Sequence, residues 1–214
     1  FALSCNTAFV QMGMAVGADA LREAAHGFGI GEQYDLGMPN ATGSLGDLPG
    51  DAELGQSAIG QRDVTMTALQ AAVMAGTVAN EGRRMAPYVV NRVLSPDLRE
   101  IETTKPRMLS DSIKPEEANT IKDLMFGSER DTWGYDGNGF ASKTGTAEHA
   151  EGAAPHTWYV AFDPVKDVAV GVVVKNGGGL GTGATGGQVS APLGRAVLYA
   201  APAAPADEEG TNAR

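Results

Sequence analysis

The stretch Ala141-Ser142-Lys143-Thr144-Gly145-Thr146-Ala147-Glu148 is predicted to form a strand at the edge of a β-sheet. On such a strand Lys143 and Gly145 lie on one face, and Thr144 and Thr146 lie on the other. Because Gly145 has no Cβ, another backbone can approach this edge closely. The edge would offer a ligand an ammonium group, hydroxyl groups and free backbone groups. The alternative is a plain edge strand with a solvated lysine, because these residue types are common.

Composition narrows the class of protein. With 214 residues, 43% of them hydrophobic and 20% charged, the chain can bury one sizeable core, or one core and a smaller lobe. The formal net charge of −10 argues against nucleic acid as a partner, because no basic stripe exists to replace counterions on a phosphate backbone. The single cysteine, Cys5, excludes an internal disulfide and a cysteine-based metal cage. No apolar run reaches the roughly 18 residues that a membrane-spanning helix needs.

The first and last residues suggest how the chain is divided into domain and tail. Phe1-Ala2-Leu3 has no initiator methionine and reads as the middle of a domain, so we expect the chain to be part of a longer protein. Residues 1–84 are expected to form a mainly helical portion of one domain, and residues 85–200 a sheet portion. Ala, Pro, Asp and Glu dominate residues 201–214, where we expect a disordered tail.

Hydrophobic periodicity predicts an α+β fold, in which an antiparallel β-sheet is flanked by helices and joined to a mainly helical subdomain. The expected helices cover residues 8–16, 18–25, 65–80, 112–125 and 188–200. The expected strands cover residues 85–94, 141–148, 157–162 and 168–175, with a hairpin turn at residues 164–167. Residues 27–60 are rich in Gly, Pro, Asn and Asp and are expected to be irregular.

The tripeptide Ser4-Cys5-Asn6 is the second stretch that suggests chemistry. A serine hydroxyl can donate and accept a proton, and an asparagine amide can do the same toward a substrate amide. Ser4 or Asn6 would also serve as the N-cap of the helix that follows. The two interpretations are compatible, because a cap position holds a side chain rigidly.

Ser-x-Asn followed by Lys-Thr-Gly on a strand that enters a hairpin resembles two signatures of the penicillin-binding proteins and serine β-lactamases. The stretches that extend this match are Ser4-Cys5-Asn6-Thr7-Ala8-Phe9, Ile59-Gly60-Gln61, Thr67-Ala68-Leu69-Gln70, Trp158-Tyr159-Val160-Ala161-Phe162 and Gly186-Gly187. Together they resemble the transpeptidase domain of a monofunctional, class B penicillin-binding protein of actinobacterial character. The resemblance covers nearly everything from Ser4 to about Ala200.

The resemblance implies a D,D-transpeptidase that cross-links the stem peptides of peptidoglycan. In that family the serine of a Ser-x-x-Lys motif attacks the penultimate D-Ala carbonyl, the terminal D-Ala leaves, and the acyl group passes to an amine of a neighbouring peptide. β-Lactam antibiotics mimic the D-Ala-D-Ala end and leave the enzyme as an acyl-serine. The serine needs a base to activate it, and the developing oxyanion needs preoriented donors.

Each matching position then has an implied role. Ser4 would relay a proton toward the leaving group, Asn6 would hydrogen-bond the acyl-side amide, and Lys143 would assist the proton relay. Thr146 would also supply a backbone N–H to the oxyanion. The implied substrate-binding residues are Thr144, Gly145 and Thr146.

One departure from the family pattern is serious. No serine or threonine in this chain has a lysine three residues further on. Ser112-Ile113-Lys114 and Thr120-Ile121-Lys122 have a spacing that does not bring the two side chains to one helix face. The nucleophile is therefore expected upstream of this chain, which alone should be inert in acylation. Either the nucleophile lies on a separate part that packs against this one, or it was lost.

Other candidates give weaker signals. The histidines His26, His149 and His156 are too scattered for a zinc-binding helix motif, and surface or loop positions are expected for them. Residues 177–187 are rich in glycine, but no Gly-Lys-Ser/Thr follows that would indicate a phosphate-binding loop. No metal and no cofactor are expected.

Two rivals to the transpeptidase remain open. One is a non-catalytic penicilloyl-binding sensor or scaffold, and the other is a serine β-lactamase, which must also activate a water molecule. The resemblance implies that the partners are peptidoglycan stem peptides, β-lactams, the missing N-terminal portion of the same protein, and a membrane-bound peptidoglycan polymerase. It also implies a place on the extracytoplasmic face of the bacterial membrane, anchored by an N-terminal segment absent from this chain.

Overall fold

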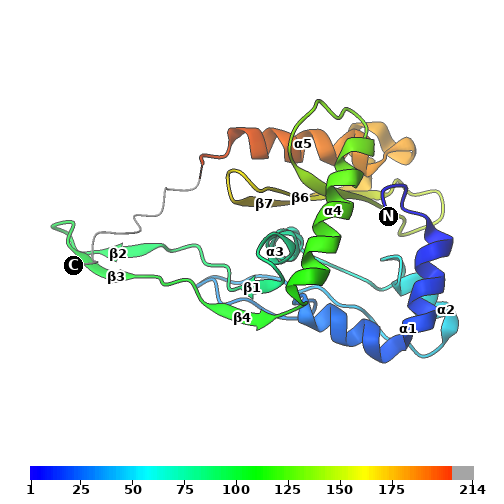
Figure 1. Cartoon of the computed structure of the whole chain (residues 1–214), viewed down its shortest axis with the longest axis horizontal. Coiled ribbons are helices and arrows are strands. Elements are labelled where there is room, and N and C mark those ends of the chain that lie inside the picture. The colour runs from blue at the N-terminus through cyan, green and yellow to red at the C-terminus, as the bar shows by residue number, and fades with distance from the viewer. Residues whose placement is uncertain (204–214) are drawn as a thin grey trace.

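The structure, a computed structural model, describes residues 1–203, and the elements are arranged as in Figure 1. Within this range the helices are α1 (Asn6–Gly27), α2 (Asp51–Ser57), α3 (Ala68–Ala79), α4 (Pro115–Asp131), the 3-10 helix η1 (Lys175–Gly183) and α5 (Gly186–Ala200). The strands are β1 (Arg83–Met85), β2 (Arg92–Leu94), β3 (Glu100–Thr103), β4 (Met108–Asp111), β5 (Ala141–Ala147), β6 (His156–Asp163) and β7 (Val168–Val174). Most of the tail expected at residues 201–214 lies outside the described residues.

The central sheet is antiparallel with the strand order β5-β6-β7, so β5 lies at one edge. Its register pairs Lys143 with Val160 and Gly145 with Trp158. The expected hairpin joins β6 to β7, and the Asp163 carboxylate accepts the backbone N–H of Val165 at 2.8 Å to close the turn. The predicted edge strand and the hairpin beside it are both confirmed.

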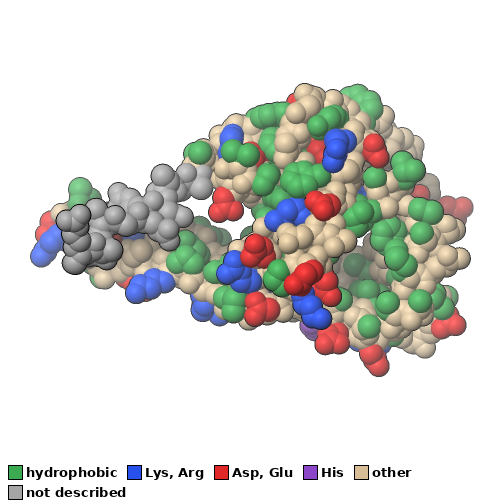
Figure 2. Space-filling view, viewed as in Figure 1, with side chains coloured by type: hydrophobic (Ala, Val, Ile, Leu, Met, Phe, Trp, Pro, Cys, Tyr) green, Lys and Arg blue, Asp and Glu red, His purple; other side chains and the backbone are tan. Residues whose placement is uncertain are grey.

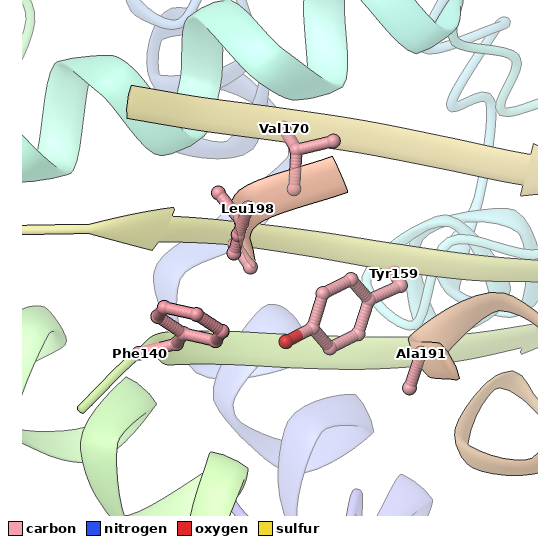
Figure 3. Packing of buried hydrophobic residues seen from close by; sticks show 6 residues of the cluster. Phe140, Tyr159, Val170, Ala191 and Leu198 are labelled. Carbon is pink, nitrogen blue, oxygen red and sulfur yellow. The ribbon is translucent and has the colours of Figure 1, made fainter. Parts of the chain in front are cut away.

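Two apolar clusters cover the two faces of this sheet. Helix α5 packs on one face, where Tyr159 is fully buried (Figure 3). Helices α3 and α4 pack on the other face, where Phe162 is buried. The members of the α5-side cluster are Phe140, Tyr159, Ala161, Val170, Ala191 and Leu198. The members of the α3/α4-side cluster are Ala75, Val78, Met125, Ala141 and Phe162.

The expected strand at residues 85–94 was wrong, because only its two ends are extended. Ala86 still donates its N–H to the carbonyl oxygen of Arg107, but Pro87 has no N–H with which to continue that ladder. The chain turns away, and β2 pairs with β3 in a separate hairpin that extends from the body (Figure 1). Strand β4, like β3, was not expected, and it pairs with β1.

The N-terminal helical region differs from the expectation in two respects. The two expected helices at residues 8–25 form one element, α1, with a kink at Gly17, where the φ angle is 84°. Its N-cap is Cys5, which makes no side-chain capping bond, so the expected cap by Ser4 or Asn6 is wrong. The Ser4 hydroxyl instead contacts a lysine on β5. Helix α2 interrupts the segment expected to be irregular, with Asp51 and Glu53 in its first turn to favour the helix dipole.

Two observations concern the distribution of charge and the apolar length of the helices. On the face shown in Figure 2, Lys and Arg side chains are interspersed with Asp and Glu rather than gathered in one area. Within residues 1–203, no helix combines the length and the apolar composition needed to cross a bilayer.

Close packing of α5 on the sheet gives a stability prediction. A Cβ added at Gly194 would overlap the ring of Tyr159, whereas a Cβ added at Gly127 in α4 meets no atom within 4 Å. We expect Gly194→Ala to lower the free energy of unfolding by about 1–3 kcal/mol through overpacking. Gly127→Ala is the control and should raise it by about 0.5–1 kcal/mol, because alanine is the better helix former. Denaturant unfolding of the full-length protein measures both, and equal effects would contradict the packing account.

Candidate active site

Lys143 lies on the face of β5 opposite to α5, beside the α3/α4-side cluster. Its side chain is half-buried, and its Nζ donates a hydrogen bond to the Ser4 hydroxyl and another, at 2.7 Å, to the carbonyl oxygen of Thr144. The same Nζ lies 5.9 Å from the centre of the Phe1 ring, within the range of a cation–π contact. The structure therefore brings Ser4 and Lys143 together across 139 positions of sequence.

Burial lowers the pKa of Lys143 below the ordinary lysine value. Desolvation disfavours the ammonium form, and among the described residues no carboxylate forms an ion pair with it to compensate. A lysine with a lowered pKa gives up its proton more easily. It can therefore exchange a proton with the hydroxyl that it touches.

Ser4 is held by a tight turn at the beginning of the chain. Its backbone N–H donates to the carbonyl oxygen of Phe1 at 3.0 Å, and its own φ angle is 51°. Positive φ is uncommon for residues other than glycine and carries a strain of about 1–3 kcal/mol. The contact with Lys143 places the hydroxyl at the edge of β5 despite this strain.

Of the other expected site residues, three lie beside Lys143 at a cavity and one does not. Thr144, Gly145 and Thr146 line a cavity with Lys143, while Asn6 is exposed at the first position of α1 and is not among the residues that line it. The Thr146 hydroxyl accepts the backbone N–H of Gly186 at 3.2 Å, which fixes the beginning of α5 against the strand.

The cavity beside β5 has a volume of about 670 Å³. Residues 143–147 of β5 line one part of it, and α3, α4 and β6 contribute an apolar part, called here the apolar floor. The apolar floor residues are Met74, Ala75, Val78, Ile121, Met125 and Val160. A ligand in this cavity would meet the Lys143 ammonium group at one side and a hydrophobic surface beneath it.

Sequence reasoning missed several residues at this cavity. Gln61 was quoted only as part of a flanking motif, but its amide reaches the carbonyl oxygen of Thr146 at 3.5 Å. His149 and His156 were expected at surface or loop positions. His149 is exposed and His156 belongs to β6, and their rings stack with centres 4.2 Å apart and both line the cavity. Burial, followed by the charges of His149 and Lys175, lowers the pKa of His156. The two histidines are close because Ala147, two residues before His149, pairs with His156 in the antiparallel sheet. Recognising that residues 141–147 and 156–163 form neighbouring antiparallel strands would have predicted this.

The described residues offer no assembled metal site. Within residues 1–203, no group of three or more His, Cys, Asp or Glu side chains is arranged to hold a metal ion.

Comparison with known proteins identifies the class to which this fold and site belong. The penicillin-binding protein transpeptidase domain matches residues 1–199, and the chain belongs to that family. This confirms the resemblance to class B penicillin-binding proteins and the predicted fold.

Individual relatives narrow the position within the family. The chain is 44% identical over 210 residues to the peptidoglycan D,D-transpeptidase PbpA of Mycolicibacterium smegmatis, and 43% identical to PbpA of Mycobacterium tuberculosis. Each match covers 94% of this chain but only 43% of the relative, so the chain spans less than half the length of these relatives. Both are mycobacterial, which agrees with the expected actinobacterial character.

Solved structures give the same result in three dimensions. The ceftriaxone acyl-enzyme complex of penicillin-binding protein A from M. tuberculosis superimposes with a TM-score of 0.89 at 42% identity, over 94% of this chain and 47% of that one. The D,D-transpeptidase domain of a peptidoglycan glycosyltransferase from Eggerthella lenta superimposes with a TM-score of 0.71 at 26% identity, over 84% and 48%.

The surroundings of Lys143 predict an unusual titration. In the full-length protein with ¹³C-methylated lysines, NMR should show the pKa of Lys143 below the ordinary lysine value. Because burial is the cause, Ser4→Ala should leave this pKa low, and a return to the ordinary value would contradict the burial account. Between the folded and unfolded pKa values the unfolded state binds more protons, so the contribution of Lys143 to stability rises with pH across that window.

Proposed function

We propose that the full-length protein is a serine-type peptidoglycan D,D-transpeptidase, which cross-links stem peptides through an acyl-serine intermediate and is acylated by β-lactams. The observation that carries this proposal is the contact between Lys143 and Ser4 at the free edge of β5. It joins the two motifs of the chain, because Lys143 lines the cavity and also hydrogen-bonds to Ser4. The relatives named as D,D-transpeptidases and the β-lactam acyl-enzyme complex of a similar protein support the same reaction.

The nucleophile is proposed to come from a Ser-x-x-Lys segment that precedes these residues in the full-length protein. No such motif occurs in the printed sequence. Part of this segment would fit into the cavity. The apolar floor would cover its hydrophobic side chains, and Lys143 would lie close to the reacting serine. Residues 1–199 would then form the C-terminal part of the catalytic domain.

Proton transfer is the step to which these residues are suited. After the nucleophilic serine attacks the penultimate D-Ala carbonyl, the C–N bond to the terminal D-Ala breaks and its nitrogen needs a proton. The Ser4 hydroxyl would donate that proton and recover one from Lys143, whose Nζ is hydrogen-bonded to it. The proton that the attacking serine gives up to its activating base would then restore the ammonium form of Lys143. The buried position of Lys143 favours such an exchange, because it lowers the pKa of the ammonium group.

Substrate positioning is assigned to the edge of β5. An extended peptide would lie along this edge, which has no neighbouring strand among the described residues. Thr144 and Thr146 would bind the terminal carboxylate, Gly145 would allow close approach, and the Thr146 backbone N–H would stabilise the oxyanion. Asn6 would hydrogen-bond the acyl-side amide. Its exposed position at the beginning of α1 leaves its amide free to meet a ligand.

The cellular setting follows from this reaction. The substrates would be peptidoglycan stem peptides, the inhibitors β-lactams, and the partner a membrane-bound peptidoglycan polymerase active in growth, cell shape or division. The reaction would take place on the extracytoplasmic face of the cell membrane, where an N-terminal segment would anchor the protein.

A fluorescent penicillin applied to the full-length protein tests the proposal against its two rivals. Lasting label together with cross-linking of stem peptides in a purified assay supports the transpeptidase. Lasting label without cross-linking would indicate a penicilloyl-binding sensor, and rapidly lost label would indicate a β-lactamase. No label at all would refute all three.

The role of Lys143 gives a matched pair of variants. We expect Lys143→Ala in the full-length protein to slow acylation by about 10²–10⁴-fold, the usual contribution of a proton-transfer group, while the fold persists. Lys105→Ala is the control, because Lys105 is exposed in the connection between β3 and β4. Time courses of penicillin labelling measure both. Unchanged acylation by the Lys143 variant would remove this residue from the mechanism.

A further inference from the structure

A buried carboxylate is hydrogen-bonded to the face of β5 that lies opposite to Lys143. Glu129, near the end of α4, is fully buried, and four side chains from different parts of the fold donate hydrogen bonds to it. Oε1 accepts from Arg195 Nε at 2.7 Å and from Asn138 Nδ2 at 2.9 Å. Oε2 accepts from the Tyr159 hydroxyl at 3.0 Å and from the Ser142 hydroxyl.

This network joins four elements of the fold, one of which, β5, carries Lys143. Glu129 belongs to α4, Ser142 to β5, Tyr159 to β6 and Arg195 to α5. Burial, followed by the charge of Glu129, raises the pKa of Tyr159, so its hydroxyl stays protonated as a donor. Burial acts against the charge of Arg195, but the hydrogen bond and charge of Glu129 outweigh it and raise the pKa of Arg195. The Tyr159 hydroxyl and the Arg195 guanidinium group therefore remain hydrogen-bond donors at neutral pH.

Stability alone is a weak reason for such a network. A buried ion pair must overcome the desolvation of both charges, and hydrophobic replacements of similar volume are often as stable. Buried polar groups are better suited to specifying one arrangement, because only that arrangement satisfies every donor and acceptor. The question is which arrangement is specified here.

Ser142 connects the network to the reaction. It immediately precedes Lys143, and side chains alternate along a strand, so Ser142 points toward Glu129 while Lys143 points toward Ser4. Tyr159, the other donor to Oε2, is the register partner of Thr144 on the far side of Lys143. The carboxylate thus holds β5 directly at Ser142, and holds β6 at the residue that pairs with Thr144. A slip of β5 by one residue would exchange its faces.

We infer that Glu129 is a positioning residue for acylation, which acts through Ser142 and Tyr159 to hold β5 so that Lys143 meets the proton-relay hydroxyl. The inference rests on the proposed function. It assigns a kinetic role to a carboxylate that touches neither substrate nor the reacting atoms.

The chain offers a matched control for this role. Ser142 and Ser190 are both fully buried serines whose hydroxyl groups make a side-chain hydrogen bond, and Ser190 pairs with Thr157 at 2.7 Å. Ser142→Ala removes a donor from the Glu129 network on β5. Ser190→Ala removes an equivalent buried hydroxyl from α5 and leaves the network intact.

The test measures acylation of the full-length protein over a range of fluorescent penicillin concentrations, which separates the acylation rate constant from the dissociation constant of the complex that precedes it. Ser142→Ala should lower the rate constant about tenfold or more, as expected when a reacting group is misplaced by a fraction of an ångström. The dissociation constant should stay within about twofold, because the network does not bind the ligand. Ser190→Ala should change neither constant.

A purely structural role would give a different result. Equal rate constants for the two serine variants, or a change confined to the dissociation constant, would overturn the inference. If Ser142→Ala does not fold, Tyr159→Phe replaces it in the same comparison, since it removes only the second donor to Oε2, and we expect a lower rate constant than in Ser190→Ala. Absence of label on the unmodified protein would refute the proposed function itself, which is a separate outcome.

Discussion

The alternation of side chains along β5 is the constraint on which the rest of the site depends. On one face of the strand Ser142 contacts the buried carboxylate of Glu129. On the other face Lys143 contacts the hydroxyl of Ser4, which lies 139 positions away in the sequence. Neither contact is possible unless the strand has one definite register and roll. Helix α5 and the pair α3 and α4 cover the two faces separately, so each group has its own surroundings.

Glu129 and Lys143 differ in how completely their surroundings satisfy them. Glu129 accepts hydrogen bonds from four side chains, one of which is the guanidinium group of Arg195, as a buried carboxylate requires. Lys143 has a hydroxyl, a carbonyl and an aromatic ring beside it, and burial lowers its pKa. On the Ser142 face of β5 the Glu129 carboxylate has a full set of hydrogen-bond donors. On the opposite face the Lys143 amine has no carboxylate partner among the described residues. The proposed proton transfer takes place on the side of Lys143, because an incompletely satisfied group gains most from a new partner.

Much of this arrangement could be predicted from local sequence. Lys143 and Gly145 on one strand face, the hairpin after it and the final helix all follow from patterns a few residues long. Their combination with Ser4 and Asn6 was enough to indicate the family. Strands β3 and β4 were missed because most of their residues are exposed, so no hydrophobic alternation marks them. Glu129 could not be found this way, since its partners lie between 9 and 66 positions away.

The backbone of Ser4 has a consequence for how this position can vary in evolution. Threonine carries the same hydroxyl group, but a branched Cβ at a φ of 51° would be a strong conformational outlier. Glycine and asparagine fit the left-handed backbone, but neither supplies a hydroxyl. Serine is therefore the residue that meets both demands, so few single substitutions at this position can keep both the hydroxyl group and the backbone conformation.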